Sequence, residues 1–128
     1  MIKAGIVGVG HLGEIHLKLI LKSNLYTLAG FFDPDKERSE NISNKYNVKS
    51  YKSYKDLCDD IDAVLICTPT LFHHEIAKFF LNNLKHVFIE KPITTNINQA
   101  NELVSIKNKN RLVGQVGHVE RFNGAFIE

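Results

Sequence analysis

Three glycines near the start of the chain have the spacing of a phosphate-binding turn. Residues 8–13 read Gly-Val-Gly-His-Leu-Gly, directly after an apolar run and directly before a segment with helical spacing. In this context Gly8 permits a tight turn, Gly10 lets the backbone approach a pyrophosphate, and Gly13 lets the helix pack against the strand. The start of the helix offers free N–H groups and a partial positive charge to phosphates. We expect the whole turn to bind a dinucleotide: Gly8, Val9, Gly10, His11, Leu12 and Gly13.

An acidic residue follows at the distance that a dinucleotide site requires. Asp33 lies twenty residues beyond Gly13, at the end of a second apolar run. A carboxylate there accepts hydrogen bonds from the adenosine ribose and repels a 2′-phosphate, which predicts NAD rather than NADP. Lys36 and Arg38 follow closely and partly offset that preference. Two alternatives stay open: a glycine turn without a ligand, and an Asp33 that caps the helix after Pro34.

Two later strand ends carry further polar side chains. Thr68 and Pro69 follow one apolar run, and Glu-Lys-Pro at 90–92 follows the next. Ligands of open α/β sheets bind outside the carboxyl ends of the strands, so we expect these residues to meet at one site. Lys91 is a candidate proton or hydrogen-bond donor to a reacting oxygen, or else a solvated lysine. His73 either lines the site or starts a helix without touching a ligand.

The remaining histidines and cysteines give weaker signals. His16, on the first predicted helix, either packs against the sheet or supports the site, because a buried imidazole needs a partner. Cys67 and Cys58 have no activating neighbours in the sequence, and we expect inert thiols. The six histidines do not have metal-ligand spacing with acids or cysteines, which predicts no metal site.

Alternating strands and helices must position these residues. The apolar spacing predicts strands at 3–9, 26–32, 48–51, 61–67, 86–89 and 112–119, and helices at 11–22, 35–46, 53–59, 71–83 and 96–108. Strands that alternate with helices form a parallel sheet with right-handed crossovers on both faces. We therefore predict a single doubly wound, Rossmann-like α/β domain of three layers. A methyltransferase shares the glycine turn but ends in an antiparallel hairpin, and no hairpin turn follows Leu112.

Length and composition limit the remaining possibilities. The 128 residues, 44% hydrophobic and 23% charged, amount to one ordinary globular domain. The 16 basic and 14 acidic residues are spread along the chain, so nucleic-acid binding has no electrostatic support. No apolar stretch reaches about 18 residues, no signal peptide is present, and two cysteines make no disulfide framework. We expect a cytoplasmic protein without membrane partners.

Taken together and in order, these motifs resemble the NAD(P)-dependent oxidoreductases of the Gfo/Idh/MocA family, named after glucose–fructose oxidoreductase and inositol dehydrogenase. The resemblance covers essentially the whole chain. It rests on GVGHLG at 8–13 with His16, Asp33, TPTLFH at 68–73 and EKP at 90–92. The ending GHVERFN at 117–123 is similar to a subset that acts on sugars and sugar nucleotides. Gly124 departs from the pattern, because similar sequences often have proline there.

The resemblance implies hydride transfer between a nicotinamide and a hydroxyl-bearing carbon of a sugar or nucleotide sugar. It makes Lys91 the catalytic residue, in contact with that hydroxyl. It assigns to the cofactor, beyond the glycine turn and Asp33, Thr68, Pro69, His73, Glu90, Lys91 and Pro92. It assigns to the substrate Lys91, Glu120, Arg121 and Asn123.

Similar enzymes carry a second, substrate-binding domain after the cofactor domain. We therefore expect residues 1–128 to be the cofactor domain alone, without its substrate domain and inactive by itself. We expect the full-length enzyme to be a homo-oligomer, and an apolar patch on this chain to promote self-association. The alternative is a stand-alone NAD-binding module that senses redox state without catalysis. The apolar, uncapped ending at 125–128 favours the first reading, and no DNA-binding element supports a transcription-linked sensor.

Overall fold

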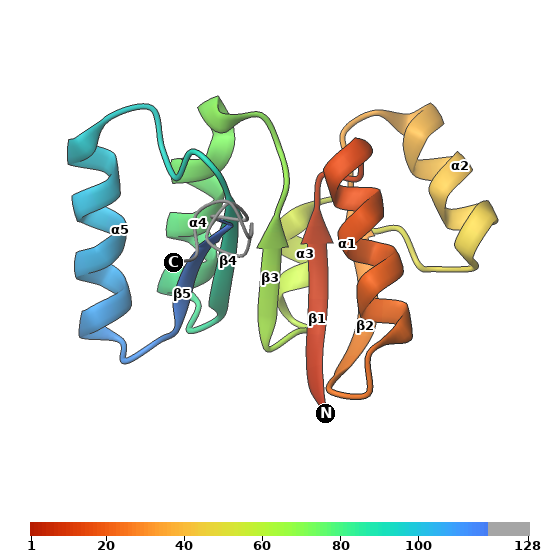
Figure 1. The fold of residues 1–128 in the computed structure, drawn as a ribbon, viewed down its shortest axis with the longest axis horizontal. Coiled ribbons are helices and arrows are strands. Elements are labelled where there is room, and N and C mark those ends of the chain that lie inside the picture. The colour runs from red at the N-terminus through yellow and green to blue at the C-terminus, as the bar shows by residue number, and fades with distance from the viewer. Residues whose placement is uncertain (118–128) are drawn as a thin grey trace, which may run out of the picture.

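The computed structural model describes residues 1–117, which form a five-stranded parallel sheet in the order β2-β1-β3-β4-β5, flanked by helices (Figure 1). The strands are β1 (Ile2–Val7), β2 (Tyr26–Phe32), β3 (Ala63–Ile66), β4 (His86–Glu90) and β5 (Gly114–Gly117). The helices are α1 (His11–Lys22), α2 (Lys36–Tyr46), α3 (Tyr54–Cys58), α4 (His73–Asn82) and α5 (Ile97–Lys109), with a 3₁₀ turn at Thr70–Phe72. The predicted doubly wound α/β fold is confirmed.

The helices divide the apolar residues between two cores, one on each face of the sheet. In Figure 1, α1 lies in front of the sheet, whereas α3 and α4 lie behind it. The core on the α1 side includes Leu17, Ile20, Phe31 and Ile42, the last from α2. The opposite core includes Leu57, Val64, Ile66, Phe80 and Leu103. Since all strand pairs are parallel, every carboxyl end lies along one edge of the sheet.

The turn from β1 into α1 requires glycine at two positions. Gly8 has a φ of +91°, which side chains rarely adopt. A Cβ on Gly13 would lie 1.8 Å from the backbone oxygen of Gly8, so any larger residue would push α1 away from β1. These two glycines bring the start of α1 directly over the carboxyl edge of the sheet.

The strand predicted at 48–51 is reduced to a single bridge. Ser50 pairs with Phe31 in parallel, with hydrogen bonds from Phe31 N to Lys49 O (3.0 Å) and from Tyr51 N to Phe31 O (2.8 Å). The segment therefore lies beside β2, where the Rossmann order places its third strand. It stays short because it is an outer edge in which only Val48 is buried.

The predicted cap of the second helix is wrong by two residues. Asp35, and not Asp33, is the N-cap of α2, and its side chain accepts a hydrogen bond from Arg38 N at 3.0 Å. Pro34 consequently stands before the helix instead of in its first turn. The physical reason is that the Asp33 side chain accepts a hydrogen bond from Val9 N in the glycine turn. Most other predicted ends differ from the observed ones by one or two residues.

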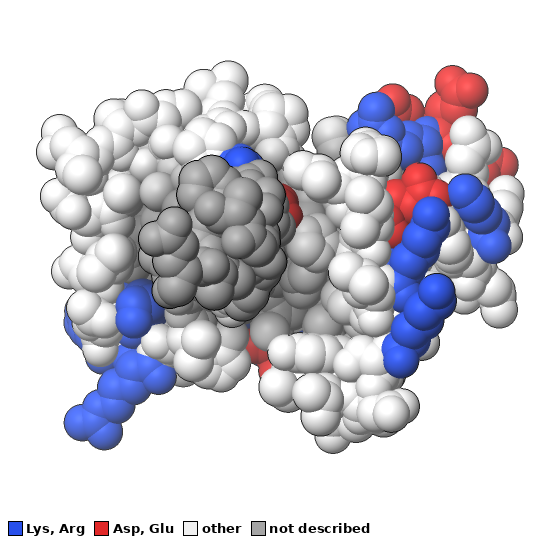
Figure 2. All heavy atoms as spheres, viewed as in Figure 1, with Lys and Arg blue, Asp and Glu red and all other residues white. Residues whose placement is uncertain are grey.

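The described surface mixes charges of both signs. Figure 2 shows basic and acidic side chains side by side over α2 and α1, without a large patch of one sign on this face. None of the helices within residues 1–117 is long and apolar enough to cross a bilayer. Both cysteines, Cys58 and Cys67, are free thiols.

Candidate functional site

A groove of about 750 Å³ lies at the carboxyl ends of β1, β2 and β3. The strand order reverses at this edge, because the chain leaves β1 toward β2 and then crosses back to β3. Open α/β sheets bind their ligands at such a reversal. The predicted cofactor residues on its walls are Gly8, Gly10, His11, Leu12, Asp33, Thr68 and Pro69.

The glycine turn gives this groove an open helix start. Gly10 is the N-cap of α1, and no side chain caps the first N–H groups of the helix. A Cβ built on Gly10 would meet nothing within 4 Å, so this face of the turn borders open space. Exposed N–H groups beside open space are what a pyrophosphate requires. The residues present therefore fit a dinucleotide.

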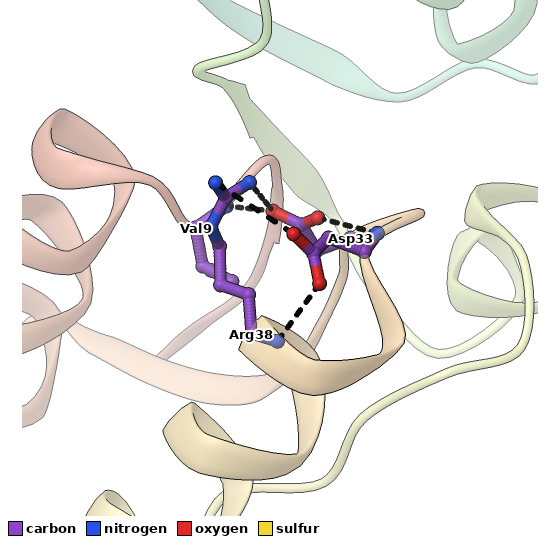
Figure 3. Close-up of polar contacts among 4 residues, drawn as sticks. Val9, Asp33 and Arg38 are labelled. Carbon is purple, nitrogen blue, oxygen red and sulfur yellow. Dashed lines mark hydrogen bonds and ion pairs between the residues drawn. The ribbon is translucent and has the colours of Figure 1, made fainter.

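Asp33 is a buried carboxylate between the glycine turn and α2 (Figure 3). Its Oδ2 accepts a hydrogen bond from Val9 N at 2.9 Å, and its Oδ1 accepts one from Asp35 N at 2.9 Å. Arg38 Nη1 lies 3.5 Å from Oδ2, a long hydrogen bond within an ion pair, and the Arg38 side chain is 48% exposed. Two backbone amides thus fix the carboxylate at the groove wall, whereas Arg38 contacts it weakly from the solvent side.

Part of the groove has an apolar wall, which the sequence did not predict. The apolar wall consists of Phe32, Tyr54, Phe72 and Ile76. Burial, and then the nearby Glu75 carboxylate, raise the pKa of Tyr54, so its phenol stays protonated. Such a surface suits a flat base such as adenine. Phe72, inside the TPTLFH segment, was the sequence signal that could have indicated this wall.

His73 lies beneath the groove instead of on its wall. It is the first residue of α4, as one of the two alternatives held, but it is 1% exposed and does not line the groove. Its Nε2 lies 2.8 Å from Thr68 O, and its Nδ1 lies 2.9 Å from Pro92 O and 3.2 Å from Ile93 O. The ring therefore links the loop that follows β3 to the loop that follows β4.

The Glu-Lys-Pro segment occupies the carboxyl end of β4, beside the groove. Lys91 and Pro92 are exposed and joined by a cis peptide bond, whereas Glu90 is buried. His16 Nε2 lies 2.6 Å from Glu90 Oε1, and the His16 ring packs edge-on against Phe88. His16 thus packs against the sheet, as one of the two alternatives held, and it also contacts Glu90 of the Glu-Lys-Pro segment.

Cys67 lies at the groove wall as a protonated thiol. Burial raises its pKa to about 12, with a smaller contribution from the Glu90 carboxylate. Burial likewise raises the pKa of Cys58. Neither side chain is therefore a thiolate at neutral pH, in agreement with the inert role that the sequence predicted.

Some predicted residues cannot be placed. The residues predicted to contact the substrate beyond Lys91 lie outside the described part of the chain: Glu120, Arg121 and Asn123. Within residues 1–117, no three His, Cys, Asp or Glu side chains come together in a way that could hold a metal ion.

Comparison with known proteins places this groove in a family. Residues 2–118 match the family described as "Oxidoreductase family, NAD-binding Rossmann fold". UDP-N-acetylglucosamine 3-dehydrogenase of Acidithiobacillus ferrooxidans is 32% identical over 123 residues, covering 96% of this chain and 39% of that protein. Myo-inositol 2-dehydrogenase of Thermotoga maritima is 32% identical over 130 residues, covering 97% of this chain and 38% of that protein.

Solved structures agree with the sequence comparison. The Acidithiobacillus enzyme superposes with a TM-score of 0.89 at 33% identity, over 97% of this chain and 40% of that one. Biliverdin reductase of Synechocystis, in complex with biliverdin and NADP⁺, superposes with a TM-score of 0.92 at 25% identity, over 97% of this chain and 40% of that one. The chain spans about two fifths of the length of these relatives. It belongs to the Gfo/Idh/MocA oxidoreductases, the family with an NAD-binding Rossmann fold that its glycine turn, Asp33 and strand-end motifs indicated.

Proposed function

We propose that this chain is the cofactor-binding part of a dehydrogenase that transfers hydride between a nicotinamide and a hydroxyl-bearing carbon of a sugar or nucleotide sugar. The observation that carries the proposal is the Asp33 carboxylate, held by the amide of Val9 at the wall of an open glycine turn. The relatives are about two and a half times as long, which supports a substrate-binding part elsewhere in the protein. Their names support the sugar-type substrate.

We assign each part of the cofactor a place along the groove. The N–H groups at the start of α1 would hold the pyrophosphate, and Asp33 would accept hydrogen bonds from the adenosine ribose. The wall formed by Phe72 and Ile76 would cover the adenine. The nicotinamide half would then extend toward the ends of β3 and β4. When bound, this group supplies the carbon that accepts or returns the hydride.

We propose NAD as the preferred cofactor, with NADP also accepted. The fixed carboxylate of Asp33 repels a 2′-phosphate at the ribose. The exposed Arg38, only 3.5 Å from that carboxylate, offsets part of the repulsion.

Lys91 is the proposed catalytic residue. It is exposed at the carboxyl end of β4, where its ammonium group can reach a ligand above the sheet edge. Its role would be to donate a proton to, or hydrogen-bond, the oxygen of the reacting carbon. The buried Glu90 and the His73 bridge to Pro92 fix the backbone on both sides of Lys91. We keep Glu120, Arg121 and Asn123 as proposed substrate contacts.

The cellular setting is also a proposal. Two free thiols support a reducing compartment such as the cytoplasm. We propose that the full-length enzyme is a homo-oligomer, as the family resemblance suggests.

Calorimetric titration of the 128-residue chain with NAD⁺ tests the proposed function. We expect binding to the wild type, and a loss of about tenfold to a hundredfold in Gly10→Ala, because the new methyl group enters the space of the phosphate. The variant should fold normally, since nothing lies within 4 Å of that methyl group, and its circular dichroism melt checks this. A folded wild type that binds neither NAD⁺ nor NADP⁺ would overturn the proposal.

A further inference from the structure

A part-buried hydrogen bond joins the first helix, α1, to the strand that leads into Lys91. His16, on α1, and Glu90, at the end of β4, are 74 residues apart in sequence, and their side chains approach to 2.6 Å. An ionised carboxylate only accepts hydrogen bonds, so His16 Nε2 must donate to Glu90 Oε1. The two side chains are 18% and 7% exposed. The proposed function uses Glu90 only to fix the backbone beside Lys91, and it gives the charge of Glu90 no task.

Small residues on both sides make room for the pair. A Cβ on Gly117 would lie 3.0 Å from Glu90 Oε2 and 2.9 Å from the Phe88 ring. Gly13 lets α1 approach the sheet closely, which brings His16 within reach of β4. Phe88 then packs edge-on against the His16 ring, with centroids 5.2 Å apart. The carboxylate of Glu90 is thus held in one place.

The charge of Glu90 lies near the β3 side of the groove. Cys67 lines the groove wall at the end of β3, and the Glu90 carboxylate contributes to the raised pKa of its thiol. The adenosine end is marked by Asp33 at β2, so the other end of a dinucleotide lies toward β3 and β4. Lys91, which follows Glu90, carries the opposite charge, but a change at Glu90 leaves that charge in place, so the change measures the contribution of Glu90 alone.

We propose that the Glu90 carboxylate, positioned by His16, makes the site bind the oxidised cofactor in preference to the reduced one. The oxidised nicotinamide ring carries a positive charge that the reduced ring lacks, so a fixed negative charge nearby stabilises only the oxidised form. This inference rests on the proposed function, because it requires a nicotinamide at the β3–β4 side of the groove. We expect a preference on the order of tenfold, which corresponds to about 1.4 kcal/mol of binding free energy.

The test is the affinity of the full 128-residue chain for NAD⁺, NADH and ADP-ribose, measured by calorimetric titration. Glu90→Gln keeps the shape of the side chain and removes its charge. We expect this variant to lower the affinity for NAD⁺ relative to NADH about tenfold, and to leave the affinity for ADP-ribose, which lacks the ring, unchanged. Glu102→Gln is the matched control, because it removes the same charge from α5, where Glu102 pairs with Lys78 at the surface.

Each outcome separates the inference from the proposed function. A wild type that binds none of the three ligands overturns the proposed function and the inference with it. If the wild type binds all three ligands and Glu90→Gln has the same relative affinity for NAD⁺ and NADH as the wild type, the inference alone is overturned. Equal losses for NAD⁺, NADH and ADP-ribose also overturn it, because they indicate a purely structural role.

A second variant covers the case in which Glu90→Gln does not fold. His16→Leu keeps the carboxylate but removes the donor that positions it. The affinity for NAD⁺ relative to NADH should then fall, as it does in Glu90→Gln. His16→Gln, whose amide can donate a hydrogen bond, should restore this relative affinity in part. An unchanged ratio in a folded His16→Leu protein overturns the inference.

Discussion

Replacing Asp33 by asparagine should weaken both cofactor binding and stability, and the structure indicates both magnitudes. The carboxylate accepts one hydrogen bond from Val9 N and one from Asp35 N. The asparagine oxygen can replace only one of these acceptors, and its NH₂ group then faces the other backbone N–H. One buried donor loses its partner, which costs about 1–3 kcal/mol of unfolding free energy.

The loss of NAD⁺ affinity has a separate origin. In the proposed complex Asp33 is a charged acceptor for the adenosine ribose hydroxyls, and hydrogen bonds to charged groups contribute about 1.5–3 kcal/mol. The Kd for NAD⁺ should therefore rise by about tenfold to a hundredfold. NADP⁺ should lose less, because the variant no longer repels the 2′-phosphate and Arg38 is released from its pairing with Asp33.

Calorimetric titration with both cofactors, beside urea denaturation of the same samples, measures the two effects independently. Asp35→Asn is the control: it removes an equal charge close by, but asparagine is as good an N-cap as aspartate, so α2 stays capped. We expect this control to retain its NAD⁺ affinity within about a factor of two to three. If Asp33→Asn bound NAD⁺ as tightly as wild type, or if Asp35→Asn lost as much affinity, the assignment of Asp33 to the ribose would be refuted.

Three further predictions concern stability and reactivity. Gly13→Ala should lower the unfolding free energy by about 3 kcal/mol, because its methyl group would lie 1.8 Å from the backbone oxygen of Gly8. A melting temperature within about 2 °C of wild type would contradict the close packing of α1 against the end of β1. The pKa of Glu14 is lowered from 4.5 to about 2, first by the hydrogen bond from Lys45, so its stabilisation is present above pH 4.5 and disappears as the pH falls to about 2. Thermal melts from pH 7 to pH 2 should show that the difference in melting temperature between wild type and Glu14→Gln shrinks below pH 4.5. A difference that stays constant would exclude the pairing of Glu14 with Lys45. In a Cys58→Ser background, Cys67, whose pKa is raised to about 12, should react with iodoacetamide at pH 8 about a thousandfold more slowly than a free thiol, and a normal rate would show that it is not buried.

Local signals predicted the elements that border the groove. The residue ranges of α1 and β2 match the prediction at both ends, because glycines precede α1 and Asp33-Pro34 follows β2. The segment at 48–51 was harder, since a short edge strand has little apolar burial to hold its pairing. The cap of α2 was misassigned because two acids flank Pro34, and only the structure shows that the first one bonds to the glycine turn.

The contacts inside the site could not be predicted from spacing. His16 and Glu90 are 74 residues apart, and no periodicity along the chain relates them. His73 lies in a recognisable motif, but the carbonyl groups that surround it belong to loops at 68 and 92–93, which meet only after the sheet forms. The apolar wall includes Tyr54, on a five-residue helix whose sequence gives no sign of a ligand.

The carboxyl edge of the sheet is held by three polar links that cross between elements. Asp33 joins β2 to the glycine turn, His73 joins the loop after β3 to the loop after β4, and the pair of His16 with Glu90 joins α1 to β4. In each case a buried side chain meets a group from another part of the chain, and an orphaned buried partner costs more than the bond contributes. We therefore expect the groove to keep its shape without a ligand. Binding would then not be weakened by the entropy cost of ordering the loops around the groove. Two of the three links contain a buried carboxylate: Asp33 lines the groove, and Glu90 lies beside it at the end of β4. In the proposed complex the first would meet neutral ribose hydroxyls, and the second would lie on the side of a ring whose charge changes in the reaction.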